Sequence, residues 1–96
     1  MRDYELLFIV KTTVGEEDTQ AIIERYSNVL AEQGAEVQSV DKWGKRRLAY
    51  TIDKVHTDGY YILVTFKGEA VAVNEVDRLM KIDERLLRHM ITRKGE

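Results

Sequence analysis

Two apolar segments, each followed by a helical pattern, constrain most strongly what this chain can fold into. The segments Arg2–Lys11 (RDYELLFIVK) and Tyr60–Phe66 (YYILVTF) are rich in β-forming residues. Apolar residues recur at helical spacing over Glu16–Gln33 after the first segment, and again after Gly68 beyond the second. A further strand pattern closes each half, at 35–52 and at 84–94. The predicted order is therefore β-α-β-β-α-β.

This order predicts an α+β fold. Right-handed crossovers place both helices on one face of a four-stranded antiparallel sheet, which is the split βαβ, or ferredoxin-like, arrangement. The first and third strands are the most apolar, so they should lie in the middle of the sheet, with the second and fourth at its edges. A chain of 96 residues is expected to form one domain, residues 1–96.

Strand alternation separates a core face from an open face. The first strand should turn the side that begins with Tyr4, Leu6 and Phe8 toward the helices, because the other side begins with two acids. The third strand should bury Tyr60 and Phe66 in the same way. Gly44, in the middle of a long strand, indicates a bulge, and Asp58-Gly59 is typical of a turn. The apolar residues left on the open face are Leu7, Ile9, Tyr61 and Leu63.

Charge is segregated along the chain although the net charge is only −2. Acids dominate 16–36, whereas 42–47 carries Lys42, Lys45, Arg46 and Arg47 with no acid, and 85–94 is again basic. Two interpretations of the first basic segment remain open. Cations at an exposed strand edge discourage aggregation, and arginine forks also suit phosphate.

Residues for catalysis or for holding a metal or cofactor are not evident in the sequence. There is no cysteine, glycines stand singly rather than in a phosphate-binding loop, and the two histidines have no recognisable catalytic neighbours. Asp83-Glu84 is interpreted as a solvated corner, and His89 as a strand-face residue. No apolar run approaches the length of a membrane span. A cytoplasmic, non-enzymatic protein without a cofactor is expected.

One stretch resembles a known signature. The segment GKRRLAYTI, residues 44–52, and the opening MRDYELLFIV are similar to those of the bacterial small-subunit ribosomal proteins that are sixth in the series. The resemblance implies a structural, cytoplasmic ribosomal protein with the same fold and no catalytic role. It also implies binding to the central domain of small-subunit rRNA, together with the eighteenth small-subunit protein.

The resemblance and the charge pattern together nominate two sets of residues. We expect rRNA contacts at Arg2, Lys45, Arg46, Arg47, Lys54, Arg88 and Arg93, the last two because the final strand should pair with the first, beside Arg2. We expect contacts with the protein partner at Tyr50, Leu7, Tyr61 and Leu63. The alternative is a ligand-binding or regulatory domain of the same topology that dimerises through this open face.

Overall fold

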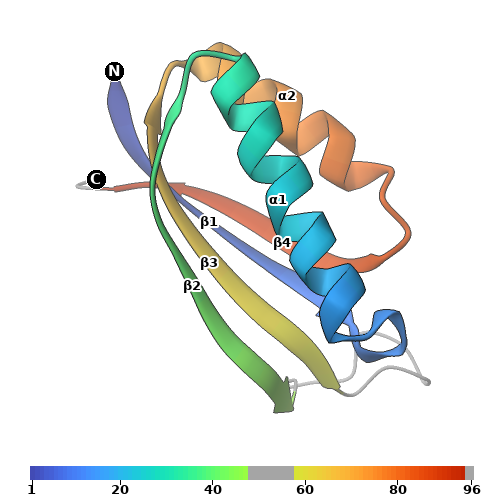
Figure 1. Ribbon diagram of the computed structural model, residues 1–96. Helices are drawn as coiled ribbons and strands as arrows, with labels where there is room; N and C mark the ends of the chain where they lie inside the picture. Colours follow the sequence, from blue (N-terminus) through green and yellow to red (C-terminus); the bar gives the residue numbers. More distant parts are fainter. Residues whose placement is uncertain (48–57, 95–96) are drawn as a thin grey trace.

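The computed structural model describes residues 1–47 and 58–94, and it describes residues 45–47 by their backbone alone. The predicted element order is confirmed (Figure 1). The strands are β1 (Arg2–Lys11), β2 (Glu36–Arg47), β3 (Asp58–Gly68) and β4 (Leu86–Arg93); the helices are α1 (Glu16–Glu32) and α2 (Ala70–Lys81), with a short 3-10 turn η1 (Thr12–Val14) before α1.

The four strands form one antiparallel sheet in the order β2-β3-β1-β4. The two most apolar strands are therefore central, as the sequence predicts. Figure 1 shows α1 and α2 side by side over the same face of this sheet. The opposite face carries no helix, so the molecule has two layers and one open sheet surface within the described residues.

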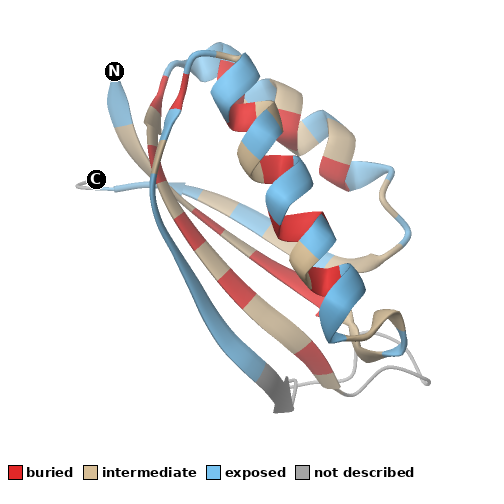
Figure 2. Ribbon diagram, viewed as in Figure 1, coloured by how far each residue is buried: buried red, intermediate tan, exposed pale blue. Residues whose placement is uncertain are grey.

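The core lies between the sheet and the helices, and it is built from alternate strand residues (Figure 2). Leu6, Phe8 and Phe66 have no exposed surface. Tyr60 is half-buried and packs against this core, which confirms the predicted face of β3. The helices contribute one stripe each, made of Ile22, Ile23, Tyr26 and Leu30 from α1 and Ala72, Val76 and Met80 from α2.

The predicted bulge occurs in β2. Lys42 lies opposite Ile62 and Gly44 opposite Tyr61, so Trp43 is the extra residue between two successive pairs. Gly44 has a φ of 80°, a conformation that residues with a side chain rarely adopt. The side chain of Trp43 lies over Tyr61 on the open face, where the two rings stack with centroids 6.2 Å apart and planes 10° apart.

The predicted turn at Asp58-Gly59 is wrong, because both residues belong to β3. Gly59 pairs with Lys11 on one side and with Arg46 on the other. A Cβ at Gly59 would lie 2.3 Å from Cγ2 of Ile9. The glycine therefore serves close packing of neighbouring strands rather than a turn.

Asp83 is not the solvated corner that the sequence indicates. Its side chain is only 7% exposed, and its carboxylate accepts the hydroxyl proton of Tyr26 at 2.6 Å. Arg85 donates to the same carboxylate through Nε at 2.9 Å and Nη2 at 2.8 Å. These Arg85 bonds hold the pKa of Asp83 well below its usual range, and burial raises the pKa of Tyr26. The cluster ties α1 to the turn before β4.

Candidate functional site

The open face of the sheet can be followed row by row from the strand registers. Residues paired across neighbouring strands share a face, and faces alternate along each strand. On β2, the exposed residue Asp41 lies in the row that also contains Leu63, Leu7 and Met90. The open-face rows that cross all four strands, each given from β2 to β4, are Gly44–Tyr61–Ile9–Arg88, Asp41–Leu63–Leu7–Met90 and Ser39–Thr65–Glu5–Thr92.

The middle of this face is apolar and partly accessible. Leu7, Tyr61 and Leu63 are half-buried, and Met90 is 55% exposed. Trp43, stacked on Tyr61, is 39% exposed. Contiguous exposed apolar surface rimmed by polar groups marks a binding surface more often than chance. The three residues predicted for partner contact are therefore brought together here, whereas Tyr50 lies outside the described residues.

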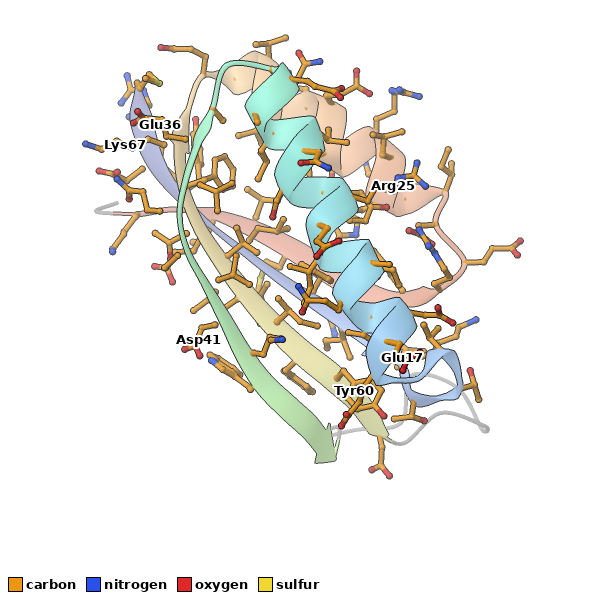
Figure 3. All side chains as sticks on the ribbon, in the orientation of Figure 1. Glu17, Arg25, Glu36, Asp41, Tyr60 and Lys67 are labelled. Carbon is orange, nitrogen blue, oxygen red and sulfur yellow. The ribbon has the colours of Figure 1, made fainter. Side chains whose placement is uncertain are left out.

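The polar residues around this apolar centre are not distributed evenly. At the end near the start of β3, Arg88 is exposed on β4 and Lys11 shares the face with Ile9. The acids Asp41 and Glu5 lie toward the middle, and the far row, Glu36–Lys67–Asp3, holds two acids and one lysine. Figure 3 shows Asp41 extending from β2 away from the helices. The open face is thus basic at one end and acidic beside its apolar centre.

The structure divides the predicted cations into separate groups. Arg93 lies opposite Tyr4 on β1, and Lys94 N–H bonds to the carbonyl of Asp3, so Arg93 and Arg2 share one end of the sheet. Arg88 lies opposite Ile9, seven positions along β1 from Arg2. That separation is about 23 Å in a strand.

The basic end of β2 forms the second group. Arg46 is opposite Gly59 and Arg47 is opposite Asp58, at the end of the sheet that also holds Lys11. Lys45 is opposite Tyr60. Because β2 and β4 are opposite edges, three strand spacings separate them, about 14 Å. Lys54 lies outside the described residues.

Lys11 was not predicted as a site residue; it lies one strand away from Gly59, in the same row as Arg46. Strand alternation alone places Lys11 on the same face as Ile9. Only the strand register shows that Lys11 and Arg46 lie on either side of Gly59. Asp41 and Trp43 were also missed as open-face residues. The bulge interrupts the alternation of β2, so the face of a residue on one side of the bulge could not be predicted from residues on the other side.

The surroundings of His89 can be described directly. His89, on β4, bonds to Asp77 of α2 at 2.8 Å, which confirms it as a strand-face residue that joins strand to helix. The His89 bond lowers the pKa of Asp77. Among residues 1–47 and 58–94 there is no group of three side chains suited to a metal ion, and no helix is long and apolar enough to cross a membrane.

These features define a class: a small ferredoxin-like α+β protein with an apolar open sheet face and cations at both ends of the sheet. The sequence profile described as ribosomal protein S6 matches residues 3–93. The chain belongs to the ribosomal protein S6 family, whose members are structural proteins of the small ribosomal subunit. The resemblance noted at residues 44–52 is thereby confirmed.

Individual relatives agree with this assignment. The small ribosomal subunit protein bS6 of Desulforamulus reducens is 51% identical over 96 residues, which is all of both chains. The bS6 protein of Moorella thermoacetica is 40% identical over all of this chain and 97% of its own length.

Solved structures agree on the fold. The crystal structure of 30S ribosomal protein S6 from Thermotoga maritima superposes with a TM-score of 0.90 at 26% identity, covering 97% of this chain and 87% of that one. The solution structure of the C-terminal domain of the MgtC protein from Mycobacterium tuberculosis has a TM-score of 0.60 at 6% identity, covering 100% and 90%. The second likeness concerns the fold alone.

Proposed function

We propose that this protein binds the central domain of small-subunit rRNA jointly with the eighteenth small-subunit protein. The observation that carries the proposal is the open sheet face, which is apolar at its centre and basic at one end. An apolar centre suits a protein partner, whereas cations suit phosphates. Membership in the family places the protein on the ribosome, which in bacteria lies in the cytoplasm.

The partner contact is assigned to the apolar centre. Leu7, Tyr61 and Leu63 come from the two central strands, which the core holds rigidly from behind. Met90 extends the surface onto β4, directly opposite Leu7. Rigid apolar residues on regular strands can be buried against a partner with little loss of conformational freedom. Tyr50 remains a prediction from the family signature.

The RNA contact is assigned to cations at both ends of the sheet. Arg2 and Arg93 form one group, and Arg46, Arg47, Lys45 and Arg88 lie toward the other end. Each phosphate contact adds to the salt dependence of binding, so the two groups can be counted separately. Lys54 is a further expected contact. The overall acidity does not oppose this assignment, because it is concentrated in the segment that contains α1.

The test measures binding of a central-domain rRNA fragment across a salt series, with and without the partner protein. Arg46→Ala/Arg47→Ala is compared with Arg2→Ala/Arg93→Ala. The control is Arg78→Ala, because Arg78 lies on the exposed side of α2, paired with Glu75. Each removed phosphate contact should lower the slope of log affinity against log salt by about 0.7 to 0.9.

A partner-dependent affinity that falls in one or both double variants, but not in Arg78→Ala, supports the proposal. Wild-type protein that binds neither the fragment nor the partner under any condition overturns it. The rival interpretation, a dimeric ligand-binding or regulatory module, uses the same open face, with Leu7, Ile9, Tyr61 and Leu63 as the dimer interface. It predicts self-association that added salt does not weaken, which sedimentation of the protein alone would reveal.

A further inference from the structure

Two open-face residues of β2, Asp41 and Trp43, are not used by the contacts proposed above. Asp41 and Trp43 are both exposed, and the indole Nε1–H of Trp43 donates to Oδ2 of Asp41 at 3.1 Å. Tyr61 lies beside Trp43, with the two ring planes only 10° apart. A carboxylate is thus held at the edge of a pair of stacked aromatic rings.

The charge of this carboxylate is not neutralised by its nearest neighbour in sequence. Lys42 pairs with Ile62 and so lies on the helix side of β2, where its Nζ donates to Oε1 of Gln20 at 2.7 Å. A carboxylate offers about four acceptor sites, and the indole uses one of them. Asp41 therefore retains acceptor sites for a donor arriving from the open side of the sheet.

We propose that Asp41, Trp43 and Tyr61 form a subsite for an arginine side chain of the partner protein. A planar guanidinium can stack on an aromatic face and donate to a carboxylate beside that face at the same time. The apolar row of Leu63 and Leu7 adjoins this site. A partner segment could therefore place its apolar residues on this row and one arginine in the subsite. The inference rests on the proposed function, since it specifies how the protein partner is held.

Charge also separates this subsite from the RNA contacts. A nucleotide stacked on Trp43 would bring its phosphate toward the Asp41 carboxylate, which repels it. The cations whose side chains are described on the open face lie in other rows, at Lys11, Lys67 and Arg88. The partner's arginine and the rRNA phosphates are therefore assigned to different parts of the surface, the arginine beside Asp41 and the phosphates toward the two ends of the sheet.

The first experiment measures the affinity for the eighteenth small-subunit protein in wild type, Asp41→Asn and Glu36→Gln. Asparagine removes the charge but keeps an acceptor for the indole N–H. Glu36 is the matched control, because it is an exposed acid on the same strand, opposite Lys67 (Figure 3). We expect Asp41→Asn to weaken binding about fivefold to tenfold, as for loss of a partly exposed charge-assisted bond, and Glu36→Gln to change it less than about twofold.

The second experiment does not need the partner. Trp43 is the single tryptophan of the chain, so its fluorescence reports on this site alone. A nine-residue peptide containing three arginines is titrated against the protein, and the matched peptide carries citrulline, which has the same shape without the charge. We expect saturable change with arginine only, lost in Asp41→Asn and in Trp43→Leu.

The outcomes separate the two proposals. Equal partner affinities for Asp41→Asn and Glu36→Gln overturn the arginine subsite and leave the proposed function standing. A protein that fails to bind the partner, yet responds to the arginine peptide in an Asp41-dependent way, overturns the proposed function; it supports an arginine site at Asp41 but removes the assignment of that arginine to the partner. Loss of rRNA affinity in Trp43→Leu without any partner overturns the subsite, because the rings would then belong to a base.

Discussion

The two faces of this sheet are made from alternate residues of the same strands, yet one is buried under the helices and the other remains accessible. Toward the helices, Leu6 and Phe8 have no exposed surface and fill a closed core. Toward the open side, Leu7 is half-buried and Met90 is 55% exposed. The first face stabilises the fold, and the apolar area of the second face is available for burial against a partner. Substitutions should therefore separate stability from binding, one strand position at a time.

The largest effect is expected from Leu6→Ala. The side chain is fully buried, so its loss should lower the free energy of unfolding by about 2–5 kcal/mol through lost burial and a cavity. Leu7→Ala, one position along, is the matched control and should lose less than half as much. Urea denaturation followed by circular dichroism measures both. Equal losses would contradict the division of the sheet into a core face and a binding face.

Asp83→Asn should come next, with a loss of about 1–3 kcal/mol, because Tyr26 and Arg85 lose a buried charged acceptor. Since Arg85 lowers the pKa of Asp83 in the folded state, the carboxylate stabilises the protein at neutral pH. That contribution declines as the pH falls below the unfolded-state pKa of about 3.9.

The difference between wild type and Asp83→Asn should therefore shrink steadily from pH 5 to pH 2. Urea denaturation at each pH measures it. Glu84→Gln is the control, because Glu84 is an exposed neighbour, and it should leave stability almost unchanged. A difference that stays constant over this range would show that the cluster does not depend on the charge of Asp83.

Gly59→Ala should also destabilise the protein, by about 1–3 kcal/mol, because the new methyl group would be forced against Ile9 on the open side. Isoleucine is branched at Cβ, so Cγ2 cannot rotate away freely. The double variant Gly59→Ala/Ile9→Ala should lose less than the sum of its single variants, as measured in a double-mutant cycle. Simple additivity would mean that the strands shift apart instead.

Met90→Thr should have the smallest effect on stability, within about 0.5 kcal/mol, because the side chain is already largely exposed. Affinity for the partner protein should nevertheless fall severalfold, which calorimetric titration would measure. Val71→Thr, at an exposed position on α2, is the control and should alter neither quantity. An unchanged partner affinity in Met90→Thr would place the partner away from the open face.

Much of the fold was predictable, because it depends on local pattern. Alternation placed Leu6 and Phe8 in the core, and the position of Gly44 indicated the bulge. The candidate site was only partly predictable. Leu7, Tyr61 and Leu63 were expected on one face and lie there, but Asp41 and Trp43 were not expected to join them.

Other parts of the site depended on strand register and on burial, which cannot be predicted from the sequence pattern alone. Lys11 becomes a neighbour of Arg46 only through Gly59, and Arg88 lies seven positions from Arg2 only because of how β4 pairs with β1. Asp83 was expected in solvent, since a carboxylate at a helix-to-strand turn is usually exposed. Its burial depends on Tyr26 arriving from α1, 57 residues earlier in the chain.

The order of the elements, the core face of each central strand and the family can be predicted from the sequence alone, because they depend on local periodicity or on one contiguous signature. Which charges are neighbours and which aromatic rings meet is visible only in the folded chain. Those relations link residues that are far apart in the chain, and they are set by strand register, by the extra residue Trp43 in β2 and by the packing of α1 on the sheet.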